Sequence, residues 1–159
     1  MFGIEKEIGD LLRRKGMTLG VVESATGGLI SHRITNVPGS SDYFKGSVTA
    51  YSDEIKARVV GVKQESLDRH GAVSAKVAEE MAEGGRKLLA VDICVADTGV
   101  AGPGGATPAK PVGLFFLGLS HGGKAHSRQH NFSGNRERNK QEAAEAALKW
   151  LKEYLSGLS

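Results

Sequence analysis

The chain has 159 residues, the size of one ordinary domain, and its 40% hydrophobic and 25% charged residues are typical of a soluble globular protein. The single cysteine, Cys94, is expected in the core and excludes an internal disulfide, and no Cys or His pair has zinc-ligand spacing. The net charge of +3 is too diffuse to indicate nucleic-acid binding, but it suits a small anionic substrate. The sequence has no apolar run of membrane length and no signal region, which predicts a cytoplasmic protein. We expect a single domain over residues 1–159.

Helical and extended apolar patterns alternate through the first half of the chain. Ile4, Ile8 and Leu12 share one helical face, which ends before Gly16, and a short buried strand follows. The elements expected here are a helix over 4–15, a strand over 19–22, a helix from about 26 to 34, a strand over 46–51 and a short helix over 55–60.

The second half of the chain opens with a longer amphipathic helix. Ser74 is a good N-cap for it, and its expected inward residues are Val77, Met81 and Leu88. A turn around Gly122-Gly123 predicts a β-hairpin. The elements expected here are a helix over 74–88, strands over 92–96, 112–119 and 125–132, and a last helix over 135–155.

Strands separated by helices favour parallel pairing, and the terminal hairpin adds an antiparallel member. We therefore expect an α/β fold, a three-layer α/β/α sandwich around a mixed, mostly parallel sheet. Ligands of such sheets bind beyond the carboxyl ends of the parallel strands. This rule directs attention to the segments that follow Val22, Ala50 and Ala96.

The first strand is followed by Glu23 and Ser24, and then by Thr26 and the Gly27-Gly28 pair. A serine at a strand-to-helix turn can present its hydroxyl to a cleft, and free N–H groups at a helix start favour an oxyanion or a phosphate. The simpler alternative is that Ser24 or Thr26 is only an N-cap. The segment is not a G-x-S-x-G elbow.

The second strand is followed by Tyr51 and, five residues later, Lys56. Both side chains can point into the cleft if a helix begins at Asp53. A lysine beside a serine can act as a general base if burial lowers its pKa. The alternative is a core tyrosine and a solvated helical lysine.

The third strand is followed by a glycine- and proline-rich loop over 97–111, which contains Thr98, Gly99 and Gly102. Loops of this length within a domain are typically functional or disordered. The loop lacks the spacing of dinucleotide and triphosphate motifs. Arg136 opens the last helix behind Gly134, where it can hold a phosphate or can simply be solvated.

Taken together, six segments resemble the CinA carboxy-terminal domain family, and the similarity runs from about residue 4 to 155. The resemblance implies a three-layer fold with a mixed sheet, no cofactor, no metal and a homo-oligomer. The length predicts a stand-alone form without the amino-terminal molybdopterin-binding-like domain of longer members. The six segments are 23–28, 51–56, 70–74, 98–105, 110–113 and 132–136.

The resemblance further implies an amidohydrolase that converts nicotinamide mononucleotide to nicotinate mononucleotide and ammonia. Ser24 matches the family's proposed nucleophile, Lys56 its partner base and Tyr51 the nearby hydroxyl. We expect the N–H groups of Thr26, Gly27 and Gly28 to hold the oxyanion, Thr98, Gly99 and Gly102 to shape the nucleotide pocket, and Arg136 to meet the phosphate.

Three positions depart from the family pattern. Ala25 stands where Cys is usual, Asp53 where Asn is usual, and Asn135 where Asp is usual. None removes a proposed catalytic group, but the charge of Asp53 would raise the pKa of Lys56 if the two are close. Two other functions stay open: a non-catalytic nucleotide-binding regulatory module, and a nucleic-acid accessory protein, as the competence- or damage-related names of some members suggest.

Overall fold

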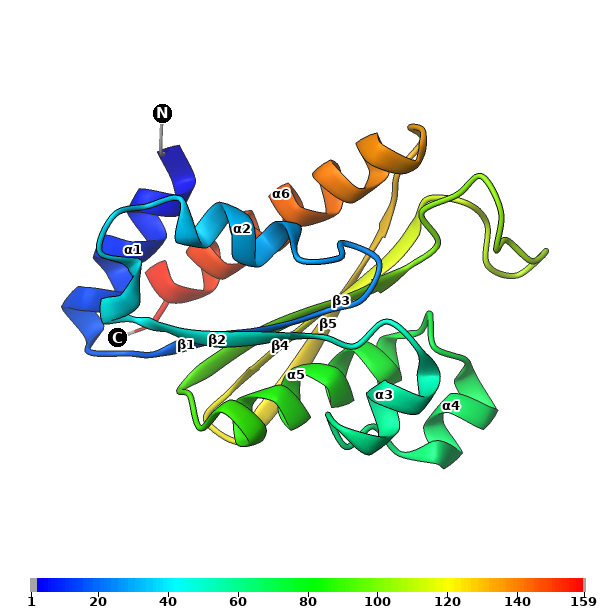
Figure 1. The fold of residues 1–159 in the computed structure, drawn as a ribbon, viewed down its shortest axis with the longest axis horizontal. Helices are drawn as coiled ribbons and strands as arrows, with labels where there is room; N and C mark the ends of the chain where they lie inside the picture. Colours follow the sequence, from blue (N-terminus) through cyan, green and yellow to red (C-terminus); the bar gives the residue numbers. More distant parts are fainter. Residues whose placement is uncertain (1–2, 159) are drawn as a thin grey trace.

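The computed structural model describes residues 3–158, which fold around one five-stranded sheet (Figure 1). Met1 and Phe2, at the end of the chain where no signal region is expected, lie outside the described residues. The strand order across the sheet is β2-β1-β3-β4-β5. The strand bounds are β1 Leu19–Glu23, β2 Phe44–Thr49, β3 Ile93–Gly99, β4 Leu114–His121 and β5 Lys124–Asn131.

The sheet is mixed, as the sequence predicts. β1 pairs in parallel with β2 and β3, and β4 pairs antiparallel with β3 and β5, so β4 alone runs against the other strands. The expected hairpin at Gly122-Gly123 joins β4 to β5. Val22 lies opposite Val48 on β2 and Ala96 on β3, so the three parallel strands end at the same edge of the sheet.

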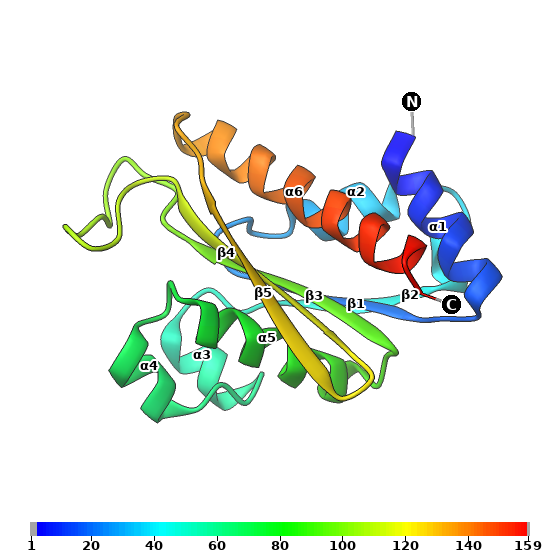
Figure 2. The ribbon, with the colours of Figure 1, turned by 180° about the vertical axis from the view of Figure 1, so that it is seen from behind.

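The helices form one layer on each face of the sheet, which confirms the three-layer α/β/α prediction (Figures 1 and 2). One layer holds α1, α2 and α6, and the other holds α3, α4 and α5. A 3-10 turn, Ser40–Asp42, precedes β2. The helix bounds are α1 Gly3–Lys15, α2 Leu29–Thr35, α3 Asp53–Arg58, α4 Gln64–His70, α5 Ala75–Leu89 and α6 Arg136–Ser156.

Each helical layer buries its own apolar core against the sheet. Leu12 and Leu148 pack with Val21 on one face, whereas Met81 packs with Val22 and the buried Cys94 on the other. No helix within 3–158 is long and apolar enough to cross a membrane. The α5 side is tightly fitted: a Cβ placed at Gly118 on β4 would lie 2.1 Å from the Ala78 carbonyl oxygen.

Several element boundaries differ from the predictions. The helix α4 was not predicted, because it buries only Ser66 and Leu67 and so carries no apolar period. Leu88 is half exposed, contrary to prediction, because Leu89 packs on the core in the space that Gly20 leaves open. The strand β3 continues to Gly99, since its last residues pair with β4 despite their polar side chains.

Candidate active site

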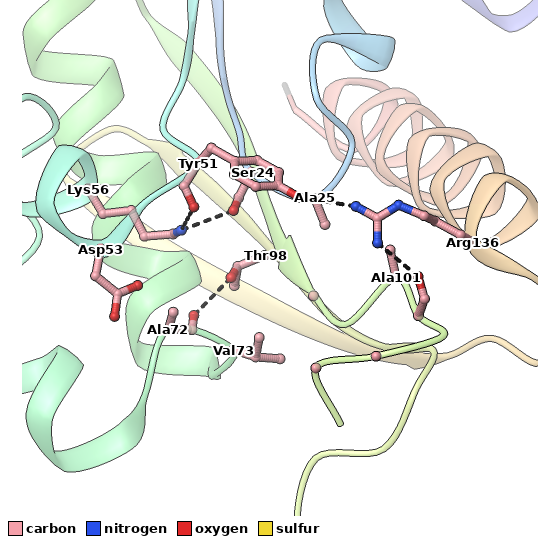
Figure 3. Close-up of a pocket in the computed structure, with 14 residues that line it drawn as sticks. Ser24, Ala25, Tyr51, Asp53, Lys56, Ala72, Val73, Thr98, Ala101 and Arg136 are labelled. Carbon is pink, nitrogen blue, oxygen red and sulfur yellow. Dashed lines mark hydrogen bonds between the residues drawn. The ribbon is translucent and has the colours of Figure 1, made fainter. Parts of the chain in front are cut away.

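A cavity of about 240 Å³ lies at the carboxyl ends of the three parallel strands. Figure 3 shows Lys56 and Arg136 approaching it from opposite sides, with Ser24 between them. The structure brings these residues together with the others that the sequence places in the pocket, which are Tyr51, Thr98, Gly99 and Gly102.

Ser24 and Lys56 are in direct contact. The Lys56 Nζ donates hydrogen bonds to Ser24 Oγ at 3.0 Å and to the carbonyl oxygen of Tyr51 at 3.1 Å. Lys56 is only 2% exposed, because Ser52 caps α3 through the Ile55 N–H and the helix then directs Lys56 inward. Burial lowers the pKa of the Lys56 amine. A lysine in this setting can lose its proton and act as a base.

Negative charges oppose this effect of burial on Lys56. Asp53, on the same helix, and Asp97, on β3, both act to raise the pKa of the amine. Asp53 lines the cavity and is exposed, whereas Asp97 is fully buried. The charge of Asp53 therefore acts on Lys56 in the direction that the sequence analysis gave for a close pair, but the effect of burial is larger.

Asp97 fixes the turn that carries Ser24. Its Oδ1 accepts the Ser24 N–H and its Oδ2 accepts the Thr26 N–H, both at 3.1 Å, and the Thr26 hydroxyl also contacts Oδ1. Burial raises the pKa of Asp97 to about 6. The sequence interpretation missed this role, although a carboxylate directly after an apolar strand at the ligand-binding edge was the available signal.

Glu23 occupies the start of α2. Its carboxylate accepts the N–H groups of Gly28 and Ile30 at 3.0 Å and that of Ser31 at 2.9 Å. Because this carboxylate caps the helix, α2 begins at Leu29 rather than near Thr26.

The expectation that Thr26, Gly27 and Gly28 donate to an oxyanion is therefore wrong. Their N–H groups are bound to Asp97, to the Ser24 carbonyl and to Glu23, respectively. The three residues line a separate surface depression beside α6. Within residues 3–158, the Ala25 N–H makes no hydrogen bond, and Ala25 lines the cavity directly after Ser24.

Arg136 and Tyr51 form the opposite wall of the cavity. The Arg136 guanidinium donates to the Gly102 carbonyl oxygen at 2.8 Å and to the Tyr51 hydroxyl at 3.1 Å (Figure 3). The Tyr51 side chain is 61% exposed, and its hydroxyl contacts Arg136 rather than Ser24 or Lys56. The structure thus places the Tyr51 carbonyl, and not its hydroxyl, beside Lys56 and Ser24.

Two buried contacts hold the remaining walls. Thr98 donates its hydroxyl to the Ala72 carbonyl oxygen at 2.9 Å, which joins β3 to the segment before α5. The fully buried Asn139 donates to the carbonyl oxygens of Ala101 and Gly134 at 3.0 Å and so fixes the start of α6 beside the glycine-rich loop. Asn139 was missed because one amide within a helical pattern carries no distinguishing spacing.

The glycine-rich loop over 100–113 extends outward from the sheet (Figure 1). It is closed at its base, where the Val100 N–H binds the Leu114 carbonyl at 2.9 Å and the Gly113 N–H binds the Val100 carbonyl at 2.8 Å. Lys110 Nζ further ties the loop to the His70 carbonyl oxygen. In residues 3–158 no three His, Cys, Asp or Glu side chains are grouped as metal ligands would be.

The sequence matches the family model of the CinA C-terminal domain over residues 2–155. The chain belongs to this family. A CinA-like protein from Salinibacter ruber is 47% identical over 96% of the chain, and a putative competence-damage inducible protein from Halothermothrix orenii is 47% identical over 94%. The chain spans only 37% and 36% of the lengths of these two relatives.

Solved structures of CinA-family proteins share the fold. A competence damage-inducible protein from Klebsiella pneumoniae is 29% identical, with a TM-score of 0.96 over 99% of this chain and 98% of its own. A competence/damage inducible protein from Agrobacterium tumefaciens is 33% identical, with a TM-score of 0.84 over 94% and 96% of the two chains.

Proposed function

We propose that this domain is a serine amidohydrolase that removes ammonia from nicotinamide mononucleotide. The observation that carries the proposal is the 3.0 Å contact between Lys56 Nζ and Ser24 Oγ, made by a lysine that is almost fully buried. Burying an amine is costly, and a site that only binds ligands gains nothing from a lysine with a lowered pKa.

In the proposed mechanism, neutral Lys56 accepts the Ser24 proton. An uncharged amine has two protons and one lone pair, so donation to the Tyr51 carbonyl leaves the lone pair available for the Ser24 hydroxyl. The serine oxygen then forms a bond to the carboxamide carbon. The protonated Lys56 gives its proton to the departing nitrogen, and ammonia leaves. Lys56 then acts as the base for a water molecule, which hydrolyses the acyl-serine.

The Ala25 N–H is the proposed donor to the oxyanion. It follows the nucleophile directly and has no acceptor within residues 3–158. A backbone donor after the nucleophile is a recurring oxyanion arrangement, typically worth about 3 kcal/mol in the transition state. Ala25 needs no side chain for this role, so its departure from the family's usual cysteine is compatible with activity.

Arg136 is the proposed phosphate ligand. It lies on the opposite side of the cavity from Lys56, and its donors are held by Gly102 and Tyr51. A phosphate can replace these two acceptors with a bidentate contact. The pyridinium charge of the substrate makes its carboxamide more electrophilic, which suits a site that relies on one lysine as its base.

Ammonia release from nicotinamide mononucleotide by the purified protein tests the proposal, with Ser24→Ala as the inactive control. Release that depends on Ser24 supports the amidohydrolase. Tight binding of the nucleotide without ammonia release would instead indicate the non-catalytic regulatory module, which would use the same loops.

A further inference from the structure

Asp97 is a fully buried carboxyl group that binds the main chain of the nucleophile turn, and the chemistry proposed above does not use it. It comes from β3, whereas Ser24 and Lys56 come from the end of β1 and from α3. Its two oxygens accept the N–H groups of Ser24 and Thr26, one on each side of Ala25. The position of the Ser24 main chain therefore depends on Asp97.

The Thr26 hydroxyl links Asp97 to a second buried carboxyl group, Glu23. The Thr26 hydroxyl lies 2.6 Å from Glu23 Oε1 and also contacts Asp97 Oδ1, but it has one proton to donate. Glu23 also accepts three N–H groups and the Ser31 hydroxyl. The Thr26 hydroxyl therefore joins the Asp97 and Glu23 carboxyls in one buried hydrogen-bonded network.

Asp97 also acts on the other member of the reactive pair. When it loses its proton, its negative charge favours the protonated form of Lys56. The other charged groups around Lys56 are Asp53 on its own helix and Arg136 across the cavity. Glu23 faces Asp97 but is directed toward α2.

We propose that Asp97 is a positioning residue for both Ser24 and Lys56: its oxygens hold the nucleophile turn, and its ionisation sets the proton affinity of the base. This inference rests on the amidohydrolase proposed above. It assigns to a buried aspartate the orienting role that the third group of a triad plays, although Asp97 contacts the nucleophile's backbone rather than the base.

Asp97→Asn is the test variant, and Glu23→Gln is the matched control, because it alters a neighbouring buried carboxyl whose oxygens hydrogen-bond neither Ser24 nor Lys56. An amide at 97 presents an NH2 group to one of the turn's N–H groups, so one bond to the turn is lost. We expect the maximal rate to fall about 10- to 100-fold with KM within a few-fold. The acid limb of the profile of rate against pH should move to lower pH in Asp97→Asn but not in Glu23→Gln.

Two readouts separate this inference from the proposed substrate. One is ammonia release, and the other is the rate at which an alkyl fluorophosphonate labels Ser24 with loss of fluoride, which needs no nucleotide. Labelling of Ser24 without ammonia release would reject nicotinamide mononucleotide as the substrate. The role of Asp97 could then still be measured from the labelling rate. A labelling profile of Asp97→Asn that matches the wild type, or an equal shift in Glu23→Gln, would overturn the role of Asp97.

A measurement on the wild-type protein covers the case in which Asp97→Asn fails to fold or Ser24 is not labelled. Lysine 13Cε resonances followed over pH, with Lys56→Arg to assign the signal, report the state of the amine directly. We expect the Lys56 signal to show a second inflection at the pH where the Asp97 13Cγ signal titrates. A Lys56 signal that does not respond there contradicts the proposal.

Discussion

Lys56 Nζ lies 3.0 Å from Ser24 Oγ, and this contact joins α3 to the turn after β1. Thirty-two positions separate the two residues in the sequence, so the sheet, which aligns the ends of β1 and β2, creates the contact. Replacing either side chain should affect the chemistry far more than the fold.

Ser24→Ala should abolish ammonia release and leave nucleotide binding within a few-fold, because only the nucleophilic oxygen is removed. Steady-state kinetics and calorimetric titration with nicotinamide mononucleotide measure the two quantities. Ser127→Ala, on β5, is a matched control that should retain activity. Near-normal turnover in Ser24→Ala would exclude Ser24 as the nucleophile.

Lys56→Arg should be nearly as inactive as Lys56→Ala. Arginine stays protonated at any pH where the protein is folded, so it keeps the positive charge but cannot accept a proton. Lys45→Arg, at an exposed position of β2, is the control for replacing a lysine by an arginine. If Lys56→Arg retains activity, Lys56 contributes its charge and another group is the base.

Arg136→Ala should raise KM for the mononucleotide far more than it lowers kcat, since the phosphate lies away from the scissile amide. The loss should correspond to about 1.5–3 kcal/mol, as for a charge-assisted hydrogen bond. The dephosphorylated riboside should be a poor substrate of the wild type, and its turnover should barely change in Arg136→Ala. Equal losses on both substrates would show that Arg136 acts on the structure of the pocket.

The stability of the protein should depend on pH through Asp97. Its pKa is raised from the ordinary value of 3.8 to about 6, so the fold favours the neutral acid. This contribution is complete below about pH 4 and is lost as the pH rises to about 6, for a total of about 3 kcal/mol in the free energy of unfolding. Urea unfolding of the wild type minus that of Asp97→Asn isolates the trend, and a flat difference would contradict it.

Gly118→Ala should destabilise the domain by about 1–3 kcal/mol, because the new methyl group would meet the Ala78 carbonyl oxygen of α5 and force the helix from the sheet. Thermal unfolding measures the loss. Gly104→Ala is the matched control, since a Cβ there meets nothing within 4 Å. Equal melting temperatures for the two variants would show that α5 adjusts without cost.

Periodicity was enough to predict the layers, the mixed sheet and most of the helices. It failed where side chains and local structure disagree: the polar end of β3 pairs with β4, and α4 has too few buried residues to show a period. These segments are fixed by neighbours that are remote in the sequence.

The rule that parallel strands end at one edge of the sheet directed attention to the segments of Ser24 and Lys56, and the family resemblance supplied the roles of these residues. Arg136 was indicated by its place at a glycine-bearing helix start. The sequence could not reveal how the helix-start N–H groups are satisfied. Glu23 and Asp97 take these donors, and a carboxylate that faces the chain's own backbone is indistinguishable in sequence from one that faces a ligand.

The paired hydrogen bonds between Val100 and the two residues Gly113 and Leu114 close the glycine-rich loop in the way that a hairpin is closed. Chain beyond that closure can change in length or composition without altering the register of β3 and β4. Relatives can therefore diversify this segment while the contact between Lys56 and Ser24 stays fixed, and grafting loops between family members would show whether this segment selects the ligand of the cavity.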